Sequence, residues 1–334
     1  MGLEALASRK VERNARFIAG VFVCSLALVL SGCASIYPQT ATLRGGLPES
    51  MPEKVELKRV PFYPQVEYQC GPAALATALS AGGAKVTPEE LVPQVYLPER
   101  KGSLQVEMLA AARRHGMVSY VLAPRFLDLL REIEAGNPVI VLYDQAFFAP
   151  WHSWHYAVAV GYDYEPGEIV LRSGEIERQA VSFPAHELMW KGSGYWAMVV
   201  MPPDRIPATA DEERWLGAIA ALEHAGDAAG ARTAYANFLK RWPQNTGAAV
   251  GLANAHHALG ELPQAERVLR EAAQRDPDSV VVLNNLAQTL SDENRDAEAL
   301  PFIERAVALG GPHAQAAGET RQTILGRLAA QRKN

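Results

Sequence analysis

Residues 63–79 read YPQVEYQCGPAALATAL, and the one cysteine in this stretch directly precedes Gly-Pro and a run of small residues. Proline is favoured in the first turn of a helix, and alanine and leucine are strong helix formers, so we predict a helix from Cys70 through Leu79. Free N–H groups and a partial positive charge in the first turn stabilise a thiolate. Cys70 therefore has the position of a nucleophile.

The N-terminus has the pattern of an export signal. A basic segment precedes an apolar run, Phe17 to Leu30, that is too short to span a bilayer. Leu30-Ser31-Gly32-Cys33 resembles the lipobox of bacterial lipoproteins, in which the cysteine is acylated and becomes the new N-terminus. We expect a signal peptide over 1–32 and a lipid on Cys33, with an uncleaved membrane anchor as the alternative. The absence of aspartate after Cys33 implies the outer membrane, facing the periplasm.

Removal of the leader leaves one thiol. The chain has three cysteines, of which Cys24 lies in the leader and Cys33 is the expected lipidation site. Cys70 then has no partner for a disulfide, although exported proteins often contain them. A lone thiol in that compartment is either buried and inert or used chemically.

A nucleophilic cysteine needs a base and a donor for the oxyanion. His155 begins a predicted strand, which can aim its imidazole rigidly, whereas His152 lies in the preceding loop. Gln65, upstream of Cys70, is the preferred side-chain donor to the oxyanion, because the adjacent Gln69 points elsewhere. The simpler alternative for His155 is a core histidine at a strand edge.

The remaining pattern divides the chain into parts. After a tether over 33–54, residues 55–201 show predicted helices first, beginning near Thr87, Ser103 and Phe126, and short β-branched or aromatic runs afterwards. This order predicts an α+β domain with a mostly antiparallel sheet. Its strands are expected at 139–143, 156–162, 168–171, 179–183 and 195–201, and a proline-rich linker at 202–211 follows.

Residues 212–334 repeat. Ala231, Ala265 and Ala299 are spaced by 34 residues, as are Trp242-Pro243 and Asp276-Pro277. This period, with small residues at helix crossings, resembles the tetratricopeptide repeat and predicts three helix pairs with a capping helix at 314–328. An ordinary helical bundle is the alternative, but a bundle has no reason to keep one period.

Both motifs together carry a family resemblance. Pro-Gln before Cys-Gly-Pro-Ala-Ala-Leu, and later Trp-His-Tyr before an apolar strand ending in Gly-Tyr-Asp, resemble the papain-like peptidases that process bacteriocin precursors at double-glycine leaders. Within that family the chain resembles the stand-alone lipoprotein relatives with tetratricopeptide repeats. It implies a papain-like α+β fold with Cys70 as nucleophile, His155 as general base and Gln65 as oxyanion donor.

The chain departs from that family at the third catalytic position. Where the family has an Asp-Pro pair on the next strand, this chain has Ser173-Gly174. A hydroxyl can orient an imidazole but cannot stabilise an imidazolium as a carboxylate does. Ser173 is the positional equivalent, with Glu175 and Glu177 as nearby substitutes.

These patterns favour a lipid-anchored cysteine peptidase that acts on a peptide or protein and uses its repeats to bind substrate or a protein partner. The alternatives are a weak or inactive papain-like scaffold that binds peptides or envelope proteins, and acyl transfer to an amine. The net charge of −5 without a basic cluster argues against nucleic acid. The eight histidines lack metal-ligand spacing and no phosphate-binding loop occurs, so we expect no metal or cofactor.

Overall fold

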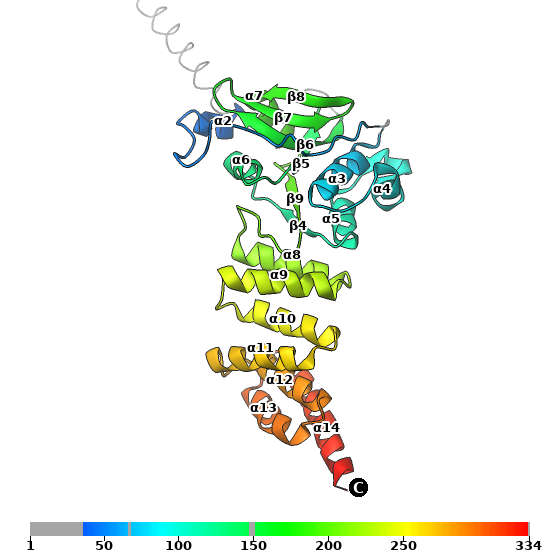
Figure 1. The fold of residues 1–334 in the computed structure, drawn as a ribbon, viewed down its shortest axis with the longest axis vertical. Helices are drawn as coiled ribbons and strands as arrows, with labels where there is room; N and C mark the ends of the chain where they lie inside the picture. The colour runs from blue at the N-terminus through cyan, green and yellow to red at the C-terminus, as the bar shows by residue number, and fades with distance from the viewer. Residues whose placement is uncertain (1–35, 66–67, 147–150, 333–334) are drawn as a thin grey trace, which may run out of the picture.

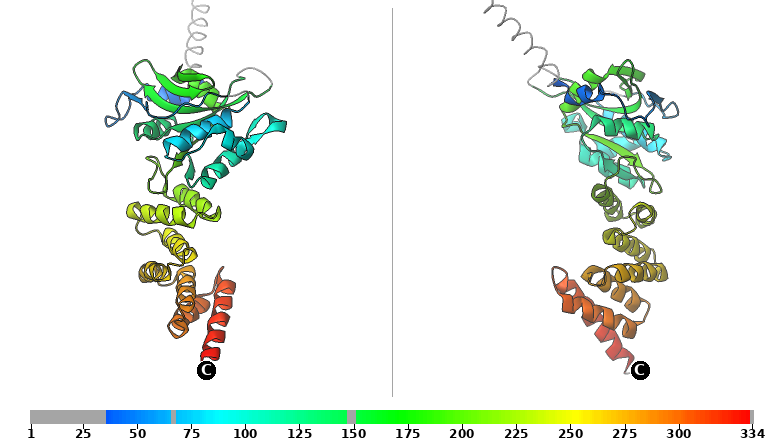
Figure 2. Two further views of the ribbon diagram at one scale, coloured as in Figure 1. Left: turned by 45° about the vertical axis from the view of Figure 1, so that its right-hand side comes forward. Right: turned by 90° about the vertical axis from the view of Figure 1, so that its left-hand side faces the viewer.

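The computed structural model describes residues 36–65, 68–146 and 151–332. An α+β domain is followed by a column of helices that extends away from it (Figure 1). Figure 2 shows the same column from two further sides. Within the described part of the chain, no helix is both long and apolar enough to cross a membrane. The predicted signal peptide and Cys33 lie outside the described residues.

The α+β domain is built on a seven-stranded sheet in the order β4-β9-β5-β6-β7-β8, with β1 paired to β6. Every pairing is antiparallel, as predicted. The predicted strands are present with shifted ends, whereas β1 and β4 were not predicted. The strands are β1 (Lys54–Glu56), β4 (Val118–Val121), β5 (Val139–Asp144), β6 (Trp154–Asp163), β7 (Glu168–Ser173), β8 (Ile176–Ser182) and β9 (Ala197–Met201).

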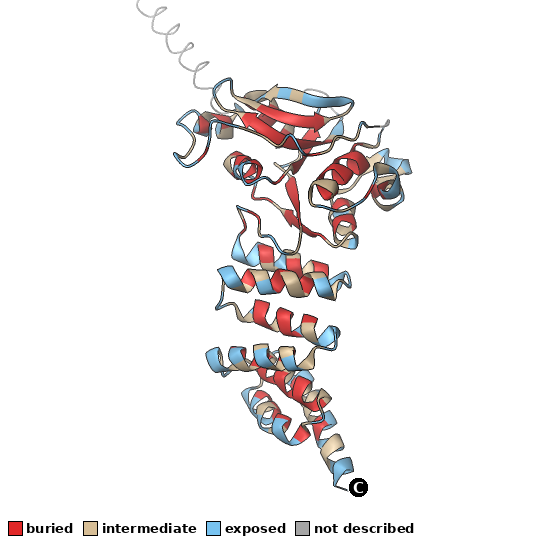
Figure 3. Ribbon diagram, viewed as in Figure 1, coloured by how far each residue is buried: buried red, intermediate tan, exposed pale blue. Residues whose placement is uncertain are grey.

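Helices cover both faces of this sheet. Side chains of α3 (Cys70–Ala81), α4 (Pro88–Val95) and α5 (Gln105–Arg114) pack with Tyr156 and Val158 of β6. Those of α6 (Phe126–Glu134) and α7 (Phe183–Lys191) pack with Ala157 and Ala159, the alternate residues of the same strand. Figure 3 shows the result, with buried strands between buried helix faces.

Local sequence signals predicted the start of α4 correctly and the start of α5 only approximately. Thr87 caps α4 as expected: its hydroxyl accepts from the Glu90 N–H at 3.5 Å, and the Glu90 carboxylate accepts from the Thr87 N–H at 3.0 Å. The helix expected from Ser103 begins at Gln105 instead. Ser103 pairs with Tyr96 in a short hairpin, β2 (Tyr96–Leu97) and β3 (Gly102–Ser103), which encloses the 3₁₀ turn η1 (Pro98–Arg100).

The predicted tether is folded onto the domain over its described residues, which corrects that expectation. Helix α2 (Pro38–Leu43) begins at the buried Glu187 of α7, whose carboxylate accepts from the Gln39 N–H at 2.9 Å and the Thr40 N–H at 2.6 Å. Leu43 and Met51 are buried in the core. The partner residue lies far along the chain, so local composition could not reveal this docking.

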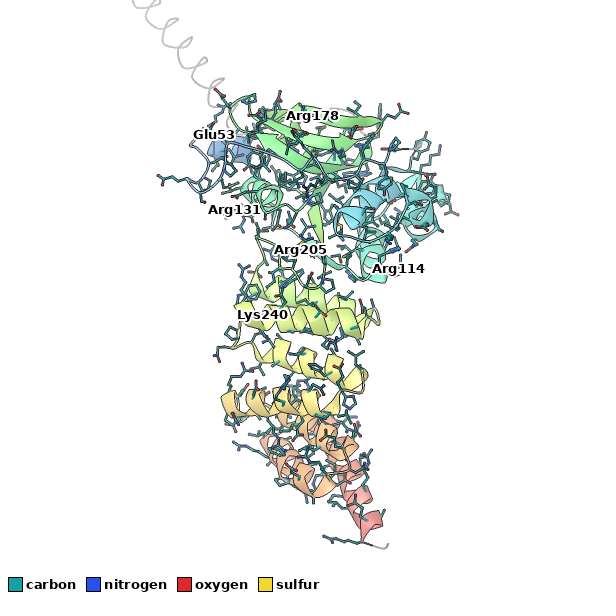
Figure 4. All side chains as sticks on the ribbon, in the orientation of Figure 1. Glu53, Arg114, Arg131, Arg178, Arg205 and Lys240 are labelled. Carbon is teal, nitrogen blue, oxygen red and sulfur yellow. The ribbon has the colours of Figure 1, made fainter. Side chains whose placement is uncertain are left out.

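Strand β1 completes that docking at the sheet. It lies beside β6 where Gly161 leaves room, since a Cβ there would lie 2.6 Å from the Val55 carbonyl oxygen. Arg178 of β8, labelled in Figure 4, pairs with Glu56 of β1 at 3.0 Å. The described residues of the predicted tether are therefore part of the α+β domain.

The linker is held by a buried carboxylate. Glu132 of α6 accepts hydrogen bonds from the Ala208 N–H at 3.3 Å, the Thr209 N–H at 2.7 Å and the Thr209 hydroxyl at 2.6 Å. Trp215, in the first repeat helix, is fully buried and packs edge-on against Tyr120 with ring centroids 5.6 Å apart. The sheet and the first repeats thus share one hydrophobic core.

The repeat region consists of three helix pairs followed by a last helix, as predicted. Ala231, Ala265 and Ala299 are all fully buried at the helix crossings. The pairs are α8 (Glu212–His224) with α9 (Ala228–Arg241), α10 (Thr246–Ala258) with α11 (Leu262–Arg275), and α12 (Val280–Asp292) with α13 (Asp296–Leu309); α14 (Ala314–Gln331) follows.

Candidate active site

Cys70 is the first residue of α3, where the sequence places it. Gln69 precedes the helix and accepts the Ala73 N–H at 3.2 Å through its carbonyl oxygen. Every residue from Cys70 to Leu79 is buried, with Cys70 itself 8% exposed, so packing holds the thiol at a defined point. The helix start is thus rigidly positioned, which a nucleophile requires.

The residue after the cysteine has to be glycine. A Cβ at Gly71 would lie 2.2 Å from the Ser103 hydroxyl, so only glycine lets the hairpin approach the start of α3. The Tyr156 hydroxyl donates to the Ser103 carbonyl oxygen at 3.3 Å. The hairpin β2–β3, the start of α3 and the start of β6 therefore meet around Cys70.

Burial and backbone donors act in opposite directions on the thiol. Removal from water raises the pKa of Cys70 above its ordinary value, although the backbone N–H groups of Tyr156, Gly71 and Cys70 lower it. We expected the helix start to stabilise the thiolate, but here desolvation is the larger effect. Cys70 rests as a neutral thiol.

His155, near the start of β6, is hydrogen-bonded to Ser173 at the end of β7. The His155 Nε2 atom lies 2.9 Å from the Ser173 hydroxyl oxygen, next to a register shift between Leu171 and Ser173. Burial lowers the pKa of His155, and the neutral hydroxyl adds no charge to oppose that effect. The imidazole is thus neutral at rest and keeps Nδ1 for another partner.

Gln65 and Ser173 line one small cavity with Cys70. The Gln65 N–H donates to the Gly174 carbonyl oxygen at 3.1 Å, which fixes this segment beside the end of β7. The cavity volume is about 10 Å³, room for about one water molecule. Three of the four predicted site residues thus line one cavity, and His155 joins them through Ser173.

The resting arrangement is not an ion pair. Among the described residues, no hydrogen bond joins the Cys70 sulfur to the His155 ring, and the pKa directions make both groups neutral. The sulfur does lie against the N–H of Tyr156, the residue after His155. Catalytic hydrogen bonds are often long without substrate and tighten on binding.

The two alternative carboxylates do not replace Ser173. Glu175 and Glu177 are exposed, and Glu177 contributes its carbonyl oxygen to the Arg172 guanidinium. Ser173 is the only side chain with a hydrogen bond to His155 among the described residues. The third position is therefore a hydroxyl in this structure.

His152, in the loop before β6, has the carboxylate partner that His155 lacks. Its Nδ1 atom lies 2.6 Å from the Asp144 carboxylate, and its ring stacks on Trp154 with centroids 4.8 Å apart. Partial burial raises the pKa of Asp144, but hydrogen bonds from His152, Ser153 and Ala146 outweigh it, so the net shift is downward. Asp144 at the end of the apolar strand β5, opposite Trp154 in the hairpin, was the signal that could have revealed this pair.

His152 and Cys70 line a second, larger cavity of about 670 Å³. His155 lines neither of the two cavities around Cys70. Within the described part of the chain, no cluster of three or more histidine, cysteine or acidic side chains could hold a metal ion.

Comparisons with known proteins agree with this division of the chain. The family model described as "Peptidase_C39 like family" matches residues 57–176, and two models described as "Tetratricopeptide repeat" match 222–278 and 258–314. No curated protein matches the chain.

Among solved structures, a C39-like peptidase from Bacillus anthracis is 19% identical, over 45% of this chain and 98% of that chain, with a TM-score of 0.37. A double glycine motif protease from an AMS/PCAT transporter, solved with its leader peptide, is 20% identical, over 42% and 91%, with a TM-score of 0.34. The TPR2B domain of yeast Sti1, in a complex with pHsp70, is 20% identical, over 35% of this chain and 97% of that chain, with a TM-score of 0.33. The family models and the fold together show an α+β C39-peptidase-like domain followed by tetratricopeptide repeats.

Proposed function

We propose that this chain is a lipid-anchored cysteine peptidase, similar to the stand-alone lipoprotein relatives of the bacteriocin-processing peptidases. The observation that carries the proposal is the meeting of Cys70, Gln65 and Ser173 in one cavity, with His155 hydrogen-bonded to Ser173. These residues come from a helix start, a loop and adjacent strands. Their assembly beside one thiol supplies the groups that acyl transfer needs.

The reaction begins with a proton transfer. The Cys70 thiol gives its proton to Nδ1 of His155, while Nε2–H donates to the Ser173 hydroxyl and keeps the ring oriented. The thiolate attacks the peptide carbonyl carbon, and the oxyanion accepts from the Gln65 side chain and the Cys70 N–H. The imidazolium then protonates the leaving amine, and water activated by His155 hydrolyses the thioester.

The electrostatics favour a slow enzyme. A buried thiol and a buried imidazole exchange charge only if the site stabilises the resulting ion pair, and Ser173 contributes a dipole where a carboxylate would contribute a charge. Substrate binding, which fills the cleft and brings the groups closer, then has to supply part of that stabilisation. A catalytically weak or inactive peptide-binding protein is the corresponding alternative.

The lipid on Cys33 holds this domain close to the outer membrane, on its periplasmic side. The supporting observations are the basic and apolar leader with Leu30-Ser31-Gly32-Cys33 in the sequence, and the docking of α2 from Pro38 onward. Five extended residues span at most about 18 Å. The peptidase therefore works near the membrane surface and does not sample a wide volume of the periplasm.

A thiol-directed electrophile tests the proposal. Iodoacetamide should label Cys70 in the wild-type protein and no other residue, and Cys70→Ala should remove labelling and peptide hydrolysis together. Comparing envelope peptides from cells with the wild-type protein and cells with Cys70→Ala then identifies substrates. Hydrolysis that survives in the Cys70→Ala variant rules out the peptidase.

Added glycinamide separates hydrolysis from acyl transfer, because only transfer produces the amide adduct.

A second candidate function is peptide binding by the repeats. Asn254, Asn284, Asn285 and Gln288 line a small groove between α10 and α12, and the Asn284 side-chain oxygen is buried without a partner. Side-chain amides can both donate hydrogen bonds to, and accept them from, the backbone of an extended peptide. Full complementation of a deletion strain by Cys70→Ala, and its loss in Asn254→Ala with Asn285→Ala, would favour this function.

A further inference from the structure

The larger cavity beside Cys70 has the dimensions of a substrate subsite. Its volume of about 670 Å³ compares with about 10 Å³ for the cavity that holds Gln65 and Ser173. The hairpin β2–β3 forms one wall, and the start of β6 with the residues after α7 forms the other. The volume accommodates several substrate side chains on one side of the reacting bond.

One wall of this cavity is cationic. Arg100 and Lys101 both line it, and no described residue that lines it is Asp or Glu. Neither cation forms an ion pair with a described acidic residue; the Lys101 ammonium lies 5.2 Å from the ring centroid of Tyr68. The preceding Glu99 does not line the cavity. Two positive charges thus face the cavity, and none of the described residues that line it is acidic.

The opposite wall does not cancel these charges. The Asp144 carboxylate lies behind it, close enough that a Cβ on Gly192 would be 3.3 Å from its oxygen. That carboxylate already accepts from His152, at 2.6 Å, and from the N–H groups of Ser153 and Ala146, at 3.0 and 3.1 Å. Its oxygens are therefore already occupied by donors, at the end of the cavity formed by His152.

The cationic wall is held in place beside the thiol. The close approach of Gly71 and Ser103, and the hydrogen bond from Tyr156 to the Ser103 carbonyl oxygen, fix the hairpin against α3 and β6. Ser103 lines the same cavity, and its hydroxyl lies against Gly71, buried without a hydrogen-bond partner.

We propose that this cavity binds a carboxylate of the peptide substrate against Arg100 and Lys101. The inference rests on the proposed peptidase function and assigns its specificity. The carboxylate belongs either to an acidic side chain or to the C-terminus of the peptide, since both present the same group to a cation.

A binding experiment on the full chain with Cys70→Ala tests this without catalysis. The probes are fluorescein-labelled, C-terminally amidated decapeptide pools that differ only in carrying Glu or Gln at one fixed position. A third pool carries Gln with a free C-terminus. Fluorescence anisotropy should give roughly tenfold tighter binding for whichever pool carries the recognised carboxylate, and the advantage should shrink as salt increases.

Reversing the charges of Arg100 and Lys101 tests whether these two residues are the source of the carboxylate preference. Arg100→Glu with Lys101→Glu should remove or invert the preference for the carboxylate, whereas the matched exposed control Lys85→Glu should leave it unchanged. Equal binding of all three pools, or the same loss in Lys85→Glu, overturns the assignment.

Wild-type cleavage of the same pools separates this proposal from the peptidase proposal. Binding with a carboxylate preference but without cleavage contradicts the peptidase and keeps the cationic subsite. Cleavage without any carboxylate preference keeps the peptidase and contradicts the subsite.

Discussion

Two histidines separated by two residues in the chain have opposite environments near Cys70. His155 is half-buried and bonded to the neutral Ser173 hydroxyl, at 2.9 Å, whereas the exposed His152 is bonded to the Asp144 carboxylate, at 2.6 Å. The pair that matches the family motif lacks the carboxylate, and the pair with the carboxylate lies in a loop. His155 thus has the rigid position on a strand, and His152 has the carboxylate that would stabilise an imidazolium.

The difference shows why a motif does not by itself specify proton chemistry. Burial positions His155 but lowers its pKa, and burial raises the pKa of Cys70, so the motif residues rest neutral. Asp144 remains ionised more readily because three donors contact it. We assign proton transfer to His155 because it lies on a strand and adjoins Tyr156, whose N–H contacts the Cys70 sulfur.

The largest expected effect comes from removing the base. His155→Ala should lower kcat/KM by roughly a thousandfold, the usual contribution of a general base. His152→Ala is the matched control, and it should lower kcat/KM by less than about tenfold. Steady-state hydrolysis of a fluorogenic peptide measures both. If His152→Ala causes the larger loss, the roles of the two histidines are exchanged.

Supplying the missing carboxylate should have the next largest effect. Ser173→Asp places a negative charge beside Nε2, so it should raise both the pKa of His155 and kcat, the latter by about tenfold or more. NMR titration of the ring and peptide hydrolysis provide the two readings. Ser182→Asp adds the same charge at the far end of β8 and should change neither. A Ser173→Asp enzyme with an unchanged His155 pKa would show that the side chain turns away from the ring.

The pH dependence of thiol labelling reports the resting state. Because burial raises the pKa of Cys70, the rate of alkylation by iodoacetamide should rise about tenfold per pH unit and continue to rise beyond pH 9. The alkylation rate at each pH is measured by quenching the reaction at fixed times and quantifying the adduct by mass spectrometry. An unfolded peptide that contains Cys70 is the reference. A plateau near neutral pH would instead reveal a preformed ion pair with His155.

The acid limb of catalysis depends on His155. Protonation inactivates the base, and its pKa is lowered, so kcat/KM should stay level as pH falls through 6.5 and decrease only below that value. A decrease centred at or above pH 6.5 in the wild-type enzyme would contradict a buried neutral imidazole.

The smallest effect should come from Asp144→Asn. Asparagine keeps an oxygen for the Ser153 and Ala146 N–H groups, so we expect a loss in kcat/KM of less than about fivefold. Hydrogen exchange at the Ser153 amide should quicken slightly, because a neutral acceptor is weaker than a carboxylate. A loss as large as that of His155→Ala would mean that the Asp144–His152 pair takes part in the proton transfer.

The sequence alone determined the features that rest on local chemistry. Cys70 before Gly-Pro and a run of alanines predicts a helix start, and β-branched runs between turns predict the strands. The spacing of Ala231, Ala265 and Ala299 predicts stacked helix pairs, because small residues recur where helices cross. All three are consequences of residue type and period, which can be read without knowing the partners.

Only the tertiary structure decided which distant segments come into contact, and how burial shifts the pKa values of the groups at those contacts. The docking of α2 on Glu187, the Asp144–His152 pair and the cationic wall at Arg100 and Lys101 join segments whose order in the chain does not predict their distance. The neutral state of Cys70 follows from the water that surrounding side chains exclude. Desolvation depends on the whole packed environment of an atom, and a linear pattern of residues does not contain it.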